Sequence, residues 1–410
     1  MKIGAAGRMI ADQGMWTLTN FALVVLVARL SSVDSFGLFG IAFGSVLVAG
    51  GLVSTLAGEV LGVTRGAALR HSGVGSLPQT ATRATEHAFG VVIIAGILAP
   101  LATAVVVWFY RNPGAASSIA WALVAVAPLA VMAEGTRSLM YALRRTDITL
   151  QVSATRLGVF VIALTVIGAA SSLDAIAVVI AWGLSALPVM VLALMRIPIR
   201  PRFLHATQAE RLRRRQFGFE YVATSGPSQG MVFLAGAILG LPAAGAIRAL
   251  QSLYGPLNVV SMGLRRYLIP VVAEDPSNVR RLGVTISLSA AGVAALGTTA
   301  LLAFPSFGEW LLGDNWPADR WVVAGFGLWR CAVSAVLGAL IILRAYDQGS
   351  WSSRLGSISA LALLIPFTLG MQIDLKTALL MSGVTSLAGA VLWWWFAFHL
   401  KDRHQAHGER

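Results

Sequence analysis

Four arginines lie inside long apolar stretches of the sequence, namely Arg29, Arg156, Arg248 and Arg330. A charge near the centre of a bilayer costs about 2.5–3.5 kcal/mol on insertion scales, so such a side chain normally faces water, a ligand or a partner. A guanidinium keeps its charge and offers paired donors to phosphate oxygens. We therefore expect these residues to line a cavity and bind an anionic substrate. The alternative is that each one pairs with a neighbouring helix or reaches the lipid headgroups.

Four acidic residues form a second group, Asp12, Glu59, Glu134 and Glu220. All lie within about two helical turns of the membrane face that we assign below to the cytoplasm. We expect them to form a cytoplasmic gate with nearby arginines; coupling to an ion and an ordinary role at the interface are the alternatives. Glu134 and Arg137 are spaced i,i+3, which predicts an ion pair on one helix.

The sequence gives no support for metal binding, nucleotide binding or enzymatic catalysis. The single cysteine, Cys331, excludes an internal disulfide and a cysteine metal cluster. His71, His87 and His205 have no acidic or cysteine partners at useful spacing, and no nucleotide-binding glycine loop is present. We therefore expect no metal, no cofactor and no catalytic residues.

The amino-acid composition indicates the kind of structural element that carries these arginines and acids. Of 410 residues, 57% are hydrophobic and 12% are charged, against about 45–50% and about 25% in soluble domains. The mean hydropathy is +0.75. Such a chain cannot hide its apolar surface in one soluble core. The composition excludes a soluble enzyme, a disordered chain and a disulfide scaffold, and it calls for a bilayer.

Twelve apolar stretches are long enough to cross a bilayer, which needs about 20 residues each. The sequence thus predicts an all-α polytopic membrane protein of twelve transmembrane helices. Tryptophans such as Trp16 and Trp316 stand near span ends, as interfacial residues do. The predicted spans are 14–31, 36–62, 86–109, 116–138, 148–170, 175–195, 217–239, 243–268, 282–304, 319–343, 352–371 and 375–400.

The positive charges fix the predicted orientation. With 31 Lys and Arg against 18 Asp and Glu, the net charge is +13. Most of these cations fall in the connections on one side, whereas the other side holds only Arg111, Arg320 and Lys376. The cation-rich side is cytoplasmic by the positive-inside rule. We expect a multi-pass protein of the cytoplasmic (inner) membrane with both termini in the cytoplasm, no cleavable signal and no nucleic-acid partner.

Seven arginines between Arg196 and Arg215 separate six spans from six. We divide the chain into an N-terminal lobe (1–195), a basic cytoplasmic linker (196–216), a C-terminal lobe (217–400) and a tail (401–410). Setting Gly37 against Gly245 aligns the halves weakly and places Asp12 opposite Glu220. Because six is even, both halves enter the membrane from the same side, so the repeat is parallel.

Several segments carry a family resemblance. They read NFALVVLVARLSSVDSFGLFGIAFGSVLVAGGL (Asn20–Leu52), EGTRSLMYALRR (Glu134–Arg145), AGAIRALQSLYGPLNVVSMGLRRYLIP (Ala244–Pro270) and FGEWLLGDNW (Phe307–Trp316). These segments resemble polysaccharide flippases of the multidrug/oligosaccharidyl-lipid/polysaccharide exporter (MOP) superfamily. The resemblance implies two six-helix lobes around a central cavity that opens alternately to either side.

The same resemblance implies a substrate, a polyprenyl-(pyro)phosphate-linked saccharide moved to the outer leaflet for envelope polysaccharide synthesis. Glycosyltransferases or a polymerase of that pathway would be the protein partners. Two alternatives stay open: a drug antiporter on the same scaffold, which would need a buried acid, and a membrane-embedded saccharide ligase or polymerase. The latter needs sizeable outer loops with catalytic residues, which the sequence lacks.

Overall fold

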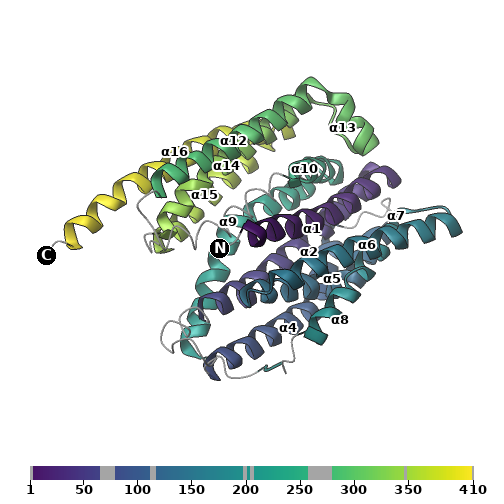
Figure 1. Ribbon diagram of the computed structural model, residues 1–410. Coiled ribbons are helices and arrows are strands. Elements are labelled where there is room, and N and C mark those ends of the chain that lie inside the picture. Colours follow the sequence, from purple (N-terminus) through teal and green to yellow (C-terminus); the bar gives the residue numbers. More distant parts are fainter. Residues whose placement is uncertain are drawn as a thin grey trace. The chain divides into compact units, whose positions relative to one another are not determined.

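The computed structural model describes residues 3–64, 79–110, 117–196, 201–203, 207–256, 279–345 and 349–408, and almost all of them are helical (Figure 1). Ten helical segments in these ranges are long and apolar enough to cross a membrane. The predicted all-α polytopic class is confirmed. The chain divides into two compact units, Met1–Val222 and Ala223–Arg410.

The first unit is built around α2 and α5. Its helices are α1 (Ile3–Leu30), α2 (Val33–Val53), a π-helical turn (Ser54–Glu59), α4 (Gln79–Tyr110), α5 (Ser118–Ala142), α6 (Thr146–Ala170), α7 (Ala175–Leu184), α8 (Leu187–Arg196) and the first half of α9 (Gln208–Ile238). Helix α5 packs against α2, α4 and α7, and α1 packs against α6 and α7. Each helix satisfies its own backbone, which a bilayer requires.

Helix α2 shows how small residues allow this packing. Every residue from Ser35 to Gly44 is buried, because three glycines in that stretch let neighbouring helices approach closely. The hydroxyl of Ser32 accepts a hydrogen bond from the backbone N–H of Ser35 at 3.4 Å and caps the helix.

The predicted span 175–195 is interrupted. Helix α7 ends at Leu184 and α8 begins at Leu187. Pro188 has no N–H for the carbonyl of Leu184, and its ring crowds that carbonyl, so the helix breaks there. The hydroxyl of Ser185 donates to the carbonyl of Trp182 at 2.6 Å, which satisfies one of the backbone groups at the break.

Helix α9 begins inside the segment predicted as a linker. Thr207 and Glu210 form a capping box: the Thr207 N–H donates to Glu210 Oε2 at 2.9 Å, and the Glu210 N–H donates to Thr207 Oγ1 at 3.2 Å. Burial lowers the pKa of Arg214 one turn further on, and the nearby Glu210 carboxylate opposes this shift. The boundary between the units, at Val222–Ala223, thus lies within a helix rather than in a loop.

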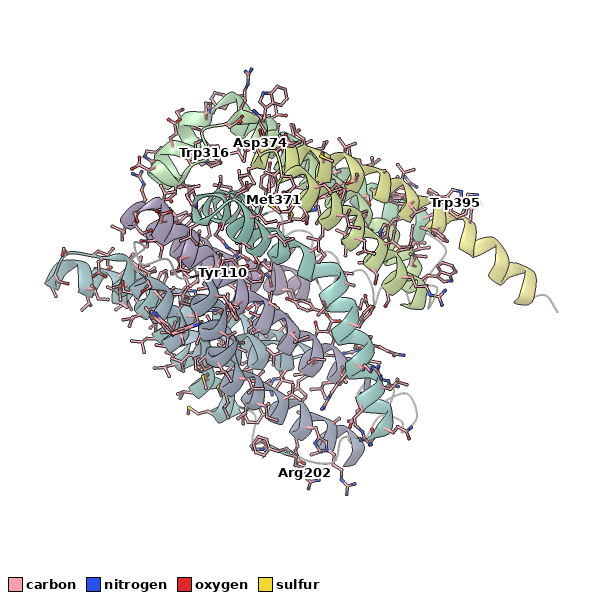
Figure 2. All side chains as sticks on the ribbon, turned by 180° about the vertical axis from the view of Figure 1, so that it is seen from behind. Tyr110, Arg202, Trp316, Met371, Asp374 and Trp395 are labelled. Carbon is pink, nitrogen blue, oxygen red and sulfur yellow. The ribbon has the colours of Figure 1, made fainter. Side chains whose placement is uncertain are left out.

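The described part of the linker also contacts the first unit. Arg202 Nε lies 2.8 Å from the Glu86 carboxylate, and the Arg202 N–H donates to the Glu86 carbonyl at 3.1 Å. Arg202 and Tyr110 lie toward opposite ends of α4 (Figure 2). On α9, Arg213 donates to Thr64 Oγ1 at 3.2 Å.

The second unit is built around α14, which packs against α12 and α16, while α15 packs against α16. It contains the rest of α9, α10 (Leu241–Leu253), α12 (Val279–Ala303), α13 (Pro305–Leu312), a 3-10 turn (Gly313–Asn315), α14 (Arg320–Ala345), α15 (Gly349–Gly370) and α16 (Leu375–Gly408). Helix α13 lies in the connection between the predicted spans 282–304 and 319–343. Trp316, which follows it, is buried against Gly308.

Two predicted spans are absent from the ten membrane-capable segments. The span 217–239 corresponds to residues 217–238 of α9, whose stretch from Thr224 to Gly230 is rich in Ser, Thr, Gly and Gln. The span 243–268 begins as α10, but residues 257–278 lie outside the described chain.

Candidate functional site

A buried carboxylate organises the interior of the first unit. Asp12 on α1 is 0% exposed, and its Oδ2 lies 3.0 Å from Arg137 Nη1 on α5. The Ser153 hydroxyl on α6 donates to Oδ1 at 2.5 Å, and the Tyr141 hydroxyl donates to Oδ2. An ionised carboxylate is tolerated in such a place only when its oxygens are paired.

Arg137 connects this carboxylate to two further groups. Its Nη2 donates to Gln13 Oε1 at 3.0 Å and lies 3.6 Å from Glu134 Oε1. The ion pair predicted from the i,i+3 spacing of Glu134 and Arg137 is confirmed. Two of the predicted gate acids, Asp12 and Glu134, therefore share one arginine.

An indole ring lies between the two buried arginines of this unit. The Arg137 Cζ lies 4.4 Å from the Trp16 ring centroid and the Arg156 Cζ 3.9 Å from it. Arg156 also lies 5.0 Å from the Trp182 ring, whose Nε1 donates to Asn20 Oδ1 at 3.0 Å. These are cation–π distances. Trp16 is buried, so its ring packs against neighbouring helices of the first unit.

Arg156 is 1% exposed, and its Nε and Nη2 find no hydrogen-bond partner among the described residues. Its charge is not isolated, because Arg137 and the carboxylates of Asp12 and Glu134 belong to the same cluster. Two arginines and two acids balance each other here.

The buried charged residues of the second unit differ from the mixed cluster of the first unit. Arg248 on α10 is buried and donates to Gln229 Oε1 on α9 at 2.8 Å. Beside it, Gln251 Nε2 donates to the Ser228 carbonyl at 2.6 Å. No Asp or Glu occurs in the sequences of α10, α12, α14 and α15 or in the second half of α9. Its helices therefore carry buried positive charge without buried acids of their own in the described ranges.

Arg330 on α14 is partly buried and faces aromatic rings. Its Cζ lies 5.4 Å from the Trp329 ring and 5.9 Å from the Tyr254 ring. The Tyr254 hydroxyl shares a 2.6 Å hydrogen bond with Thr298 Oγ1 on α12. Arg330 is thus held beside the junction of α10, α12 and α14.

The remaining predicted site residues lie elsewhere. Arg29 is exposed in the last turn of α1, and Glu59 is exposed at the end of the π-helical turn. Glu220 is buried on the first half of α9. In the described part of the chain, no three His, Cys, Asp or Glu side chains gather as a metal site would require.

The sequence contained a signal for Trp16 and Asn20, which were not predicted as site residues. Together with Asp12 they recur every four residues, which places all three on one face of a helix. That stripe points to the interior of the first unit. The partners on α5, α6 and α7 have no comparable signal, because their contacts depend on tertiary packing.

Comparisons with known proteins support the fold. Neither a scan of known protein families nor a search among curated proteins finds a match. Among solved structures, the inward-facing conformation of a multidrug resistance MATE family transporter of the MOP superfamily matches with a TM-score of 0.70 and 13% identity, covering 98% of this chain and 99% of that one. An outward-facing conformation of such a transporter matches at 0.66 and 13%, covering 99% and 95%.

A MOP superfamily transporter from Pyrococcus furiosus also matches, with a TM-score of 0.65 and 13% identity, covering 96% of this chain and 93% of that one. At such low identity the likeness establishes the fold alone. The chain has the fold of MATE transporters of the MOP superfamily over essentially its whole length.

Proposed function

We propose that this protein is a membrane transporter that works by alternating access, and that it moves a polyprenyl-(pyro)phosphate-linked saccharide from the inner to the outer leaflet of the cytoplasmic membrane. Its fold is that of membrane transporters, and the segments quoted above resemble flippases. Both termini would lie in the cytoplasm, and glycosyltransferases or a polymerase of an envelope pathway would supply and consume the substrate.

The observation that carries the substrate class is the pair Arg248 and Arg330. Both lie on helices of the second unit that contain no acid, so they contribute positive charge to its interior. Guanidinium donors match phosphate oxygens in charge and geometry, which favours an anionic headgroup. The related transporter from Pyrococcus furiosus is described as having a binding pocket of reverse polarity that suggests a different function.

A transport assay tests the proposal. Purified protein is reconstituted in liposomes with a fluorescent polyprenyl-pyrophosphate-linked sugar, and flipping is followed as the gain of accessibility of inner-leaflet probe to an impermeant reductant added outside. We expect Arg248→Gln and Arg330→Gln each to slow flipping about tenfold or more, because a charge-assisted hydrogen bond is lost.

Arg281→Gln is the matched control, because Arg281 is exposed at the start of α12 in the same unit. It should flip the probe at the wild-type rate. Wild-type flipping by both arginine variants, with all proteins equally folded by size-exclusion chromatography, would remove the support for an anionic substrate.

A drug antiporter is the second candidate, and Asp12 favours it. This acid is buried in the first unit, and two of the matching structures are of multidrug resistance transporters. Its carboxylate is already paired with Arg137, which leaves less negative charge for a cationic solute. Export of a cationic dye that Asp12→Asn abolishes, together with no flipping of the lipid-linked sugar, would favour the antiporter.

A further inference from the structure

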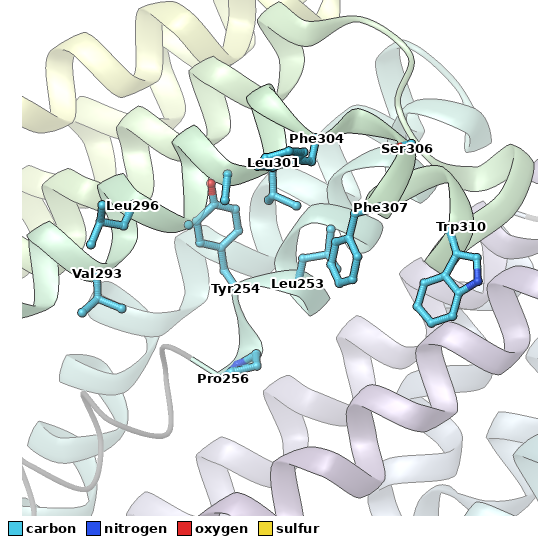
Figure 3. A pocket seen from close by; sticks show the side chains of 12 residues that line it. Leu253, Tyr254, Pro256, Val293, Leu296, Leu301, Phe304, Ser306, Phe307 and Trp310 are labelled. Carbon is cyan, nitrogen blue, oxygen red and sulfur yellow. The ribbon is translucent and has the colours of Figure 1, made fainter.

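An apolar groove runs along α12 in the second unit. It has a volume of about 950 Å³, which lies near the upper end of the range for small-molecule sites. Figure 3 shows the residues that line it, among them Tyr254, Val293, Leu296, Phe304, Phe307 and Trp310.

The groove follows from helical periodicity. From Val293 to Phe304, its residues on α12 recur at spacings of three and four, so they form one stripe along the helix. Eleven residue steps at 1.5 Å give a length of about 16 Å, which is roughly half the hydrocarbon thickness of a bilayer. Leu296, near the middle of the stripe, is 72% exposed, so the groove is open on its side.

The groove changes in chemistry along its length. One end is formed by Phe307 and Trp310 on α13, which precedes α14. Tyr254 lies beside the middle of the stripe, where its hydroxyl shares a 2.6 Å hydrogen bond with Thr298, and its ring lies 5.9 Å from the Arg330 guanidinium carbon. Arg330 is ten residues into α14, or about 15 Å along the helix from its start. A cation therefore stands behind the Tyr254 ring, about half a bilayer thickness from the start of α14.

We propose that this groove holds the isoprenoid chain of a phosphorylated lipid while the phosphate lies beside Arg330, with the Tyr254 ring between the two. This inference rests on the proposed function and names the part of the chain that accommodates the substrate's tail. Charge complementarity decides the occupant. A resting phospholipid keeps its headgroup at the membrane surface, near α13, and would place only its acyl chain beside Tyr254. A lipid in transit brings its anionic group to mid-depth.

Photocrosslinking in nanodiscs tests this assignment. The probe is a polyprenyl phosphate with a diazirine on the prenyl chain, and labelled peptides are identified by mass spectrometry. We expect labelling of the α12 and α13 segments that line the groove. Unlabelled polyprenyl phosphate should compete with the probe, whereas an equal amount of phosphatidylglycerol should not. Labelling elsewhere, or equal competition by phosphatidylglycerol, would overturn the assignment.

Two leucines on α12 give a matched pair of variants. Leu296→Trp fills the groove and should lower labelling about tenfold. Leu288→Trp changes a residue on the same helix that is 69% exposed and does not line the groove, so labelling should stay at the wild-type level. Equal labelling of both variants would contradict the proposal. Arg330→Gln should weaken labelling by the phosphate probe and leave labelling by the corresponding prenol unchanged.

The outcomes separate this inference from the proposed function. Labelling of the groove without flipping in the transport assay would keep the groove assignment and reject transport of that lipid. Flipping with the crosslinks placed elsewhere would reject the groove and keep the transport proposal.

Discussion

At the residue scale, Asp12 and Arg137 illustrate why charges inside a membrane come in sets. The pair is buried and its contacts extend to Gln13, Tyr141 and Ser153, so neither charge is left without hydrogen bonds. The indole of Trp16 lies between two guanidiniums and stabilises both through its π face. Removal of one member would leave the others buried and uncompensated.

Arg137→Met is therefore expected to lower the free energy of unfolding by about 3–5 kcal/mol, as when one partner of a buried ion pair is removed. The double variant Asp12→Asn with Arg137→Met should recover part of that loss, because no buried carboxylate then lacks its cation. Thermal unfolding in detergent, followed by intrinsic fluorescence, measures both.

The matched control is Arg145→Met, which breaks the exposed 3.7 Å pair with Asp147 at the junction of α5 and α6. An exposed pair contributes less than about 1 kcal/mol, so this variant should unfold close to the wild-type temperature. If Arg145→Met and Arg137→Met shifted unfolding equally, the buried cluster would have no special role in stability.

At the element scale, the π-helical turn Ser54–Glu59 interrupts the regular hydrogen bonding that continues α2. Ser138 on α5 fits this irregularity: its hydroxyl donates to the Ser54 carbonyl at 3.0 Å and accepts from the Ser54 hydroxyl at 2.9 Å. Gly58 lies against the Ser138 side chain with no room for a Cβ. Short π-helical segments are frequent at functional sites of helical proteins.

Gly58→Ala should destabilise the protein by about 1–3 kcal/mol, because the added methyl group collides with Ser138 in a packed interior. Gly62→Ala, one turn later, is the control, since its Cβ would meet only the Ala142 methyl at 4.0 Å. That substitution should be neutral or stabilising, because alanine is the better helix former. The thermal unfolding assay above distinguishes them, and equal destabilisation would rule out the tight contact at Gly58.

More of the transmembrane helices than of the candidate site could be predicted from the sequence. Hydropathy gives the spans because a bilayer demands long apolar helices. The break at Ser185, the π-helical turn and helix α13 escaped this approach, since none of them changes the average hydropathy of a window. Of the contacts between side chains around Asp12, only the Glu134–Arg137 ion pair could be predicted, because its two residues are close in the sequence. Arg137 and Asp12 are 125 residues apart in the chain, and only folding brings them together.

At the scale of the whole molecule, the distribution of charge predicts the topology. The chain has one cysteine, so Cys331→Ser gives a background without thiols. In that background we expect Asp314→Cys, on the 3-10 turn, to react with a membrane-impermeant maleimide in right-side-out spheroplasts. Arg211→Cys, near the start of α9, should react only after permeabilisation. Both positions are exposed, so a reversed pattern would refute the predicted orientation.

The contacts of helix α9 determine where this helix can bend in a transporter of this fold. Its first half is held by the first unit through Arg213 and through Tyr221, whose hydroxyl donates to the Leu47 carbonyl at 3.4 Å. Its second half is held by Arg248 through Gln229. The junction falls between these anchors, and Pro227 within it cannot donate to the carbonyl of Ala223. In a transporter that changes from an inward-open to an outward-open state, α9 must bend within fewer than three helical turns. The bend would fall where the backbone hydrogen bond to the Ala223 carbonyl is missing.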